Sequence, residues 1–290
     1  MIRSHRVRAN GLSHHVLEWS GDDGRSSNEP AVVLLHGFMD TARSWDLVVP
    51  HLVRGGRRVF APDLRGFGDT DRVPEGGYYH FADYVADVEG IVDELCGDQP
   101  FHLIGHSMGG TVATLYAGAR PERVARLALL EGLGIRDNPP SAAPLRMHRW
   151  LEDLRSHRLR DVARGPRSME QAFQSLQGNH PTVPAEVLQS RLPHLIDRAP
   201  DGSLVWRFDP LHRTTSPAVF RTEIHLEFIA RITCPVLIVG GGPRGFHVPD
   251  EDARIATFVN AARTEIDDAG HMMHWTRPTQ LANLLLGFLG

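Results

Sequence analysis

The sequence predicts an α/β fold, in which a mostly parallel, doubly wound sheet carries a helical insertion. Three observations lead to this prediction. Short apolar runs closed by glycine or proline alternate with stretches of helical periodicity. One run ends in a Gly-x-Ser-x-Gly turn, which is typical of a strand that turns sharply into a helix. The alternation stops between residues 135 and 217 and then resumes, as expected for an insertion into a sheet.

Several apolar runs have the length and composition of strands that are buried on both faces of a parallel sheet. They are residues 32–35, 59–61, 101–104, 127–130 and 236–239. A further strand is expected at 264–266, followed by a final helix at 278–289. Residues 81–95 and 111–119 have the periodicity of helices that pack on this sheet.

Composition excludes several classes of function. The 31 basic and 35 acidic residues are spread along the whole chain, so nucleic acid is not expected as a partner. Lysine is absent from the sequence, which excludes Schiff-base chemistry and lysine-dependent phosphate loops. Cys96 and Cys234 lie far apart and are expected to be reduced thiols, so neither a metal nor another cofactor is predicted.

The first ten residues lack the apolar stretch of a secretory leader, and the chain contains no apolar run long enough to span a membrane. We therefore expect a cytoplasmic protein without a membrane partner. A small-molecule substrate is the expected ligand, and the sequence leaves the oligomeric state open.

The strongest motif is Gly105-His106-Ser107-Met108-Gly109. It lies between a predicted strand and a predicted helix, which is the context that a nucleophilic serine on a strained turn requires. Glycine is needed where the strand and the helix nearly touch, and the helix amino terminus favours developing negative charge. We therefore predict that Ser107 is a nucleophile.

Acyl transfer through an oxyanion needs two preorganised amide donors. Met108 supplies one because it follows the nucleophile directly. The loop His36-Gly37-Phe38-Met39 follows the predicted strand 32–35, so the amide of Phe38 is the expected second donor.

A general base is expected near the carboxyl end of the chain. His271 follows the predicted strand 264–266 in an Ala-Gly-His sequence and precedes the final helix. A histidine on such a loop can reach a serine at the sheet edge. His106 and His274 are interpreted as structural residues.

Taken together, these motifs resemble the α/β-hydrolase family over essentially the whole chain. The resemblance includes His36-Gly37-Phe38, the segment Asp63-Leu64-Arg65-Gly66-Phe67-Gly68, the serine turn and Gly270-His271. It implies a core of residues 1–134 and 218–290 and a helical cap of residues 135–217 that shapes the substrate pocket. The family cleaves esters, thioesters, amides, epoxides, carbon–halogen bonds and carbon–carbon bonds, so the substrate stays open.

The sequence departs from the family pattern at the acid. The usual aspartate follows the seventh strand, where this chain has Gly245 instead. Glu131 directly follows the predicted strand 127–130 and is the best substitute, as in one subgroup of haloalkane dehalogenases that it resembles. Among the alternatives, Asp250 and Asp252 are better interpreted as the first turn of a helix. The pair at 267 and 268 is too close to His271 in sequence to approach it readily.

The nucleophile type narrows the chemistry. Epoxide hydrolases and dehalogenases of this family attack with an aspartate, whose alkyl ester can be hydrolysed at its own carbonyl. A serine would leave an ether, so Ser107 indicates attack on a carbonyl carbon and an acyl-enzyme. Ester or thioester hydrolysis is therefore the first hypothesis. Carbon–carbon bond hydrolysis, acyl transfer, or ligand binding by a weakly catalytic receptor of the same fold are the alternatives.

Large side chains around the predicted site are candidates for the walls of an apolar substrate pocket. We selected Met39 beside the oxyanion loop, Trp150 and Trp206 in the cap, and Trp275 just after His271. Residues of this kind also form the core of a cap, and the sequence alone does not separate the two roles.

Overall fold

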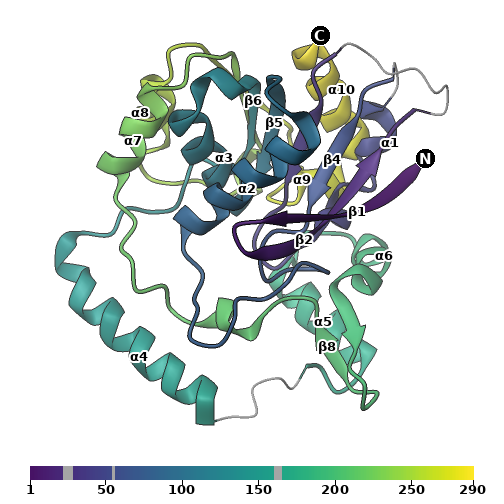
Figure 1. The fold of residues 1–290 in the computed structure, drawn as a ribbon, viewed down its shortest axis with the longest axis vertical. Coiled ribbons are helices and arrows are strands. Elements are labelled where there is room, and N and C mark those ends of the chain that lie inside the picture. The colour runs from purple at the N-terminus through teal and green to yellow at the C-terminus, as the bar shows by residue number, and fades with distance from the viewer. Residues whose placement is uncertain (22–28, 54–55, 160–164) are drawn as a thin grey trace.

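A computed structural model describes residues 1–21, 29–53, 56–159 and 165–290 of the chain. Its main feature is an eight-stranded sheet in the order β1-β2-β4-β3-β5-β6-β9-β10 (Figure 1). The strands of this sheet are β1 (Ile2–Ala9), β2 (Leu12–Trp19), β3 (Val32–Leu35), β4 (Val59–Pro62), β5 (Phe101–His106), β6 (Val124–Leu130), β9 (Val236–Gly240) and β10 (Ala261–Glu265). From β4 to β10 the neighbouring strands are parallel, which confirms the predicted fold class.

The helices are α1 (Val49–Leu52), α2 (Phe81–Cys96), α3 (Met108–Ala119), α4 (Ala143–Leu159), α5 (Met169–Asn179), α6 (Ala185–Leu195), α7 (Thr222–Ala230), α8 (Glu251–Thr257), α9 (Met273–Thr276) and α10 (Pro278–Leu289). Some of them cover the sheet, and α4, α5 and α6 form the insertion (Figure 1). Alternate residues of each central strand face opposite layers. Leu103 and Leu127 pack with α2, α3 and α7 in one core, whereas Ile104 and Ala128 pack with α1, α9 and α10 in the other.

The register of the central strands places two predicted site residues side by side. His106 at the end of β5 pairs with Leu130 at the end of β6, and Leu130 in turn pairs with Val239 of β9. Ser107 and Glu131 are the next residues along β5 and β6, so both project from the carboxyl edge of the sheet. Ligands of open α/β sheets bind at this edge.

The first two strands form an antiparallel hairpin that the sequence analysis did not predict. β1 is an edge strand whose inward residues include Val7 and Ala9, while most of its other positions are exposed and polar. Its hydrophobic pattern is therefore weak. The usable signal was the Asn10-Gly11 pair, because both residues have positive φ, 45° and 80°, as a tight two-residue hairpin turn requires.

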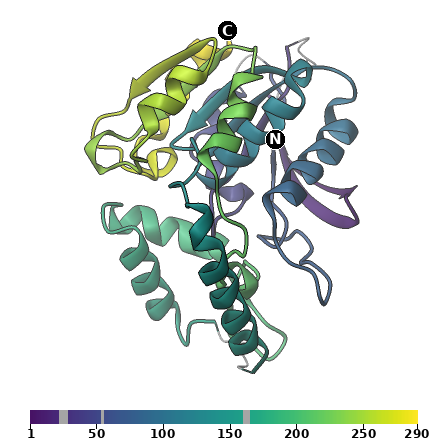
Figure 2. The same cartoon turned by 90° about the vertical axis from the view of Figure 1, so that its left-hand side faces the viewer.

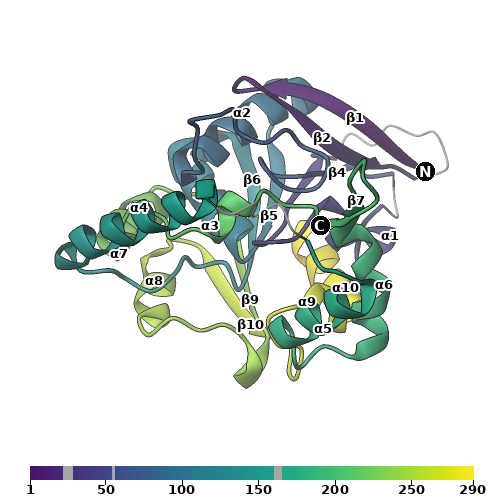
Figure 3. The same ribbon diagram turned by 90° about the horizontal axis from the view of Figure 1, so that it is seen from below.

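The segment expected to form the cap contains α4, α5, α6 and a short antiparallel pair, β7 (Ile196–Arg198) with β8 (Leu204–Trp206). The two strands add to the helical insertion that the sequence predicts. They were not predicted, because three-residue strands carry too little pattern to be recognised. Figure 2 shows the segment at one end of the core. Seen from below, α5 and α6 lie near α9 (Figure 3), and the hydrophobic core of the two helices includes Met272 and Trp275.

Within the described residues, no helix combines the length and the apolar character needed to cross a bilayer. The cytoplasmic location expected from the sequence stays a prediction.

The buried His102 is expected to make the stability of the fold depend on pH. His102 of β5 is 3% exposed, and neither ring nitrogen has a hydrogen-bond partner among the described residues. Burial, together with the charges of Arg57 and Arg126, lowers the pKa of His102 to about 4. The unfolded chain therefore binds this proton first, and the stability contributed by the neutral ring is present above pH 6.5 and declines as the pH falls towards 4.

We expect His102→Leu to make the protein less sensitive to acid. The free energy of unfolding of the wild type should fall between pH 7 and pH 5 by about 1 kcal/mol more than that of the variant, after allowance for solvent screening. Urea denaturation at the two pH values measures this difference. An identical pH dependence in both proteins would show that His102 has the same pKa in the folded and unfolded chain.

Candidate active site

Ser107 occupies a strained turn between β5 and α3. Its backbone has φ 52° and ψ −116°, a conformation that residues with a β-carbon rarely adopt. Its amide donates to the carbonyl of Leu130 at 3.0 Å, which ties the turn to β6. A β-carbon at Gly105 would meet the backbone of Gly109 and lie 2.6 Å from the Cα of Gly110, so glycine allows strand and helix to approach closely.

Glu131 occupies a comparable position at the end of β6. It also has positive φ, 47°, and its amide donates to the carbonyl of Val239 at 3.1 Å. Its carboxylate is buried and held by two backbone amides: Gly241 donates to Oε1 and Phe246 donates to Oε2, each at 2.7 Å. These bonds hold the side chain in one orientation.

The imidazole of His271 contacts this carboxylate directly. His271 Nδ1 lies 2.6 Å from Glu131 Oε2, and the His271 side chain is 32% exposed while that of Glu131 is 1% exposed. A carboxylate in this position accepts the Nδ1 proton, so the lone pair is left on Nε2, the nitrogen that a general base uses.

Gly245 lies against the same carboxylate. A β-carbon built on Gly245 would collide with Glu131 Oε1. A side chain at the family's usual acid position is therefore incompatible with Glu131 in its present orientation. The structure thus gives a steric reason for the missing aspartate.

The other acidic candidates have different partners. Asp250 precedes α8 and accepts hydrogen bonds from Arg254 at 2.9 Å and Thr222 at 3.0 Å. Asp268 is exposed and pairs with Arg244 at 3.3 Å. These contacts stabilise the surrounding structure, and neither carboxylate pairs with His271.

A buried histidine layer supports the loop that carries His271. His106 Nε2 lies 2.8 Å from the backbone carbonyl of His271, to which it donates. Burial, with the nearby His274 and His271, lowers the pKa of His106 well below its usual value, so the ring is neutral. His274 is held by Ser44 at 2.7 Å, and its ring lies 4.4 Å from that of His106. The residue before the nucleophile therefore positions the base loop.

The predicted oxyanion donors lie in the same region. Met108 begins α3, so its amide has no partner within the helix. The loop that contains Phe38 is held by His36, whose Nε2 accepts from the amide of Leu64 at 3.0 Å and whose Nδ1 lies 2.7 Å from the carbonyl of Gly37. This anchoring keeps the backbone around Phe38 in a fixed orientation, as a preorganised oxyanion site requires.

Ser107, His271, Glu131, Phe38 and Met108 all line one cavity of about 670 Å³. This volume suits a small-molecule ligand. Much of the rest of the wall is aromatic or aliphatic and comes from two places, the segment before and at the start of α2 and the segment around the start of α7. These residues include Tyr78, Tyr79, Phe81, Val219, Phe220 and Ile224.

The structure places the four predicted pocket residues elsewhere. None of Met39, Trp150, Trp206 and Trp275 is among the described residues that line this cavity. Trp275 is 3% exposed and donates from Nε1 to Ser44 Oγ at 2.9 Å, so it belongs to the core that α9 shares with α5 and α6.

The remaining three pack around the site without entering it. Trp206 stacks on Phe208 at a centroid distance of 5.9 Å, and Met39 packs against the main core with φ 60°. Trp150 lies edge-on to Tyr78 at 5.6 Å, just behind the wall. Tyr78 was not predicted as a pocket residue. The Tyr78-Tyr79 pair, in a loop before a helix, is an aromatic signal that could have indicated this part of the wall.

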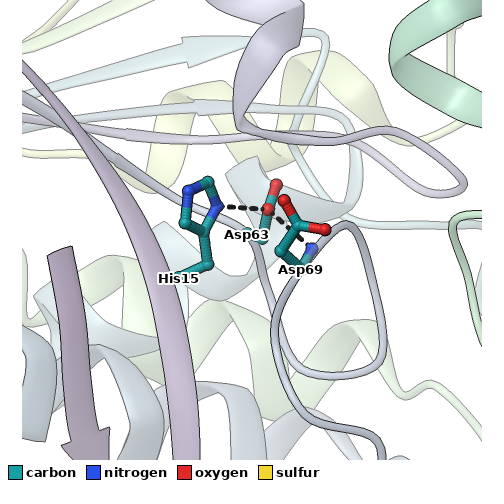
Figure 4. Close-up of side chains that lie close together, drawn as sticks. All are labelled: His15, Asp63 and Asp69. Carbon is teal, nitrogen blue, oxygen red and sulfur yellow. Dashed lines mark hydrogen bonds and ion pairs between the residues drawn. The ribbon is translucent and has the colours of Figure 1, made fainter. Parts of the chain in front are cut away.

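Three described side chains offer possible metal ligands within 4.8 Å of one another: His15, Asp63 and Asp69 (Figure 4). Asp63 already accepts hydrogen bonds from His15 Nδ1 at 2.7 Å and from the amides of Asp69 and Ala42 at 3.0 and 2.6 Å. Burial alone would raise its pKa, but these bonds hold the pKa of Asp63 below its usual value. We interpret the group as a clamp between β2 and the loop after β4.

Comparison with known families agrees with this geometry. The family model of the alpha/beta hydrolase fold matches residues 30–278, most of the chain. The chain belongs to the α/β-hydrolase family. The resemblance inferred from the motifs is thereby confirmed at the level of the family.

Among curated relatives, this α/β-hydrolase is 38% identical over 133 residues to Epoxide hydrolase 2 of Siraitia grosvenorii. The match covers 46% of this chain and 40% of that protein. It spans 40–43% of the three Siraitia epoxide hydrolases that it resembles.

Solved structures match the hydrolase along nearly its whole length. A hypothetical protein of Pseudomonas aeruginosa PAO1 superposes with a TM-score of 0.85 at 27% identity, covering 98% of both chains. The thioesterase domain from the curacin biosynthetic pathway superposes with a TM-score of 0.81 at 25% identity, covering 99% of both chains.

Proposed function

We propose that this α/β-hydrolase cleaves a carboxylic ester or thioester of a small to medium, largely apolar substrate through an acyl-enzyme on Ser107. One observation carries the proposal. A serine on a strained strand-to-helix turn lines the same cavity as a histidine whose Nδ1 lies 2.6 Å from a buried carboxylate. This combination matches the requirements for an activated oxygen nucleophile.

The proposed reaction has two balanced steps. His271 Nε2 takes the proton of the Ser107 hydroxyl while Oγ bonds to the substrate carbonyl carbon, and the oxyanion is stabilised by the amides of Phe38 and Met108. The proton then passes from His271 to the leaving alkoxide or thiolate, which departs. Water, deprotonated by His271, attacks the acyl-serine, and Ser107 recovers its proton as the acid leaves. Throughout, Glu131 stabilises the imidazolium.

The epoxide hydrolase relatives suggest another bond type, but the nucleophile argues against it. Attack by a serine on an epoxide carbon would give an ether without a carbonyl for water to attack, so the enzyme would not turn over. The thioesterase domain among the structural neighbours is compatible with the serine chemistry. Ester and thioester bonds therefore fit the side chains present.

The proposal predicts selectivity among bond types. Initial rates with p-nitrophenyl acetate, butyrate and octanoate and with the thioester S-phenyl thiobutyrate should show saturable turnover, whereas styrene oxide should give no diol. The esters are followed by absorbance, and the diol by chromatography. Diol formation from the epoxide without hydrolysis of any ester or thioester would contradict the proposed function.

A further inference from the structure

The charges that line the active-site cavity do not balance. The Glu131 carboxylate is already paired with His271 and with two backbone amides. His212 and His225 also line the cavity, and burial lowers the pKa of each to about 4, so both rings are neutral near pH 7. Among the permanently charged side chains of the described wall, two arginines remain, and they differ in their surroundings.

Arg221 already has anionic partners. It lies 3.0 Å from Glu223 and 3.7 Å from Asp137, and it also reaches the carbonyl of Asn138 at 3.5 Å. Its charge is therefore balanced by the protein itself.

Arg146, on α4, lacks such a partner. Its Nε, like that of Arg221, is shielded from solvent and has no hydrogen-bond partner among the described residues. Unlike Arg221, it has no described carboxylate within ion-pair distance of its side chain. Shielded donors of this kind are normally satisfied, because an unmade hydrogen bond to a charged group is costly. Along the same helix, Arg149 is exposed. The pKa of Asp153 is lowered mainly by two hydrogen bonds from Thr215 and further by the charge of Arg149.

We propose that Arg146 binds a carboxylate of the substrate, so that the hydrolase prefers an ester or thioester that carries a second, anionic end. The inference rests on the proposed function and names the substrate class of that site. The planar guanidinium presents donors in a fork that matches a carboxylate bidentately. A phosphate monoester carries about two negative charges near pH 7, whereas the described wall offers one cation without an anionic partner. A carboxylate, with a single negative charge, is therefore the better fit.

The wall also indicates what joins the two ends of the substrate. Arg146 belongs to the cap helix α4, and Ser107 to the sheet edge, and both line the one cavity with aliphatic residues such as Leu115, Ile135 and Ile224. An apolar spacer between the scissile carbonyl and the carboxylate would contact these side chains. Half-esters of short aliphatic diacids have this chemistry.

Equilibrium binding tests the inference without turnover. In the Ser107→Ala protein, monomethyl glutarate and its neutral counterpart dimethyl glutarate are titrated by calorimetry. We expect the anionic probe to bind about 10- to 100-fold more tightly, the range expected for a charge-assisted bidentate pair. Arg146→Met in the same background should remove this preference, Arg146→Lys should keep part of it, and Arg149→Met, on the exposed side of α4, should leave it unchanged.

Kinetics with the catalytically intact protein give the second arm. The KM of p-nitrophenyl hemiglutarate should be lower than that of p-nitrophenyl methyl glutarate. Arg146→Met should raise the KM of the hemiglutarate far more than that of the methyl ester, whereas Arg149→Met should leave both values unchanged. Equal binding of both probes, or an equal loss of both in Arg146→Met, would overturn the inference. Arg146-dependent binding without hydrolysis of either ester would support the carboxylate site and contradict the ester hydrolase, so the two failures are distinguishable.

Discussion

Replacement of Ser107 by alanine is expected to lower kcat for every hydrolysed ester by about 10⁵- to 10⁶-fold, because it removes the atom that forms the acyl-enzyme. The remaining rate over water would come from the oxyanion donors and from substrate binding. The cavity and the Glu131–His271 pair do not depend on the hydroxyl, so substrate affinity should change little. Steady-state rates measure the loss, and binding of a product acid measures the affinity.

A second variant, Ser107→Gly, serves as a control because it changes the backbone strain at the same position. Ser107→Gly also removes the nucleophile, but it relieves the positive φ and should raise the free energy of unfolding by about 1 kcal/mol relative to Ser107→Ala. The two variants should therefore be equally inactive and differ in stability. Full activity in either of them would contradict the whole mechanism.

The second large effect is expected from the acid. Glu131→Gln keeps the shape of the side chain but removes the charge that fixes the His271 tautomer and stabilises the imidazolium, so kcat should fall by about 10⁴-fold. If the activity of Glu131→Gln stayed within a few-fold of that of the wild type, another carboxylate would have to support His271. Deacylation should suffer together with acylation, because both steps use His271.

Gly245 allows a sharper test of the same residue. Its backbone has φ −75° and ψ −177°, which any residue adopts, so the main obstacle to an aspartate there is the Glu131 side chain. The Gly242 carbonyl oxygen, 3.0 Å from the added β-carbon, would have to shift slightly. In the double variant Glu131→Gly with Gly245→Asp, the acid moves to the position usual in the family, and the positive φ at residue 131 suits glycine.

We expect the double variant to recover at least about 10-fold of the activity lost in Glu131→Gly, in keeping with the strong coupling of residues in contact. Gly245→Asp alone should lose stability, because the new side chain meets Glu131. Measured rates and denaturation midpoints of the four proteins complete the cycle. An additive outcome, without recovery, would show that the carboxylate cannot act from position 245.

Much of the fold was predictable because its signals are local. The central strands are buried on both faces, so their apolar runs stand out, and the serine turn follows one of them. Once β5 and β6 are neighbours, Ser107 and Glu131 must project from the same edge. Their catalytic roles stay predictions, but their proximity followed from the pattern.

The walls of the cavity were not predictable in the same way. Tyr78 and Phe220 come from loops whose positions depend on how the segment after β8 returns to the sheet, where Asp209 bonds to Gly66 and Tyr79. This is tertiary information. Large aromatic residues such as Trp275 gave a misleading signal, because the interior of a cap and the wall of a pocket favour the same residue types.

Every step of the proposed reaction passes through an acyl-enzyme on Ser107, which intact-mass spectrometry during the first turnovers with p-nitrophenyl butyrate would detect. We predict a mass increase equal to one butyryl group, located on the peptide that contains Ser107, absent from Ser107→Ala and longer-lived in Glu131→Gln. Turnover of the ester without any adduct in the wild type or in Glu131→Gln would contradict an acyl-enzyme on Ser107. An adduct that also forms in Ser107→Ala would contradict it as well.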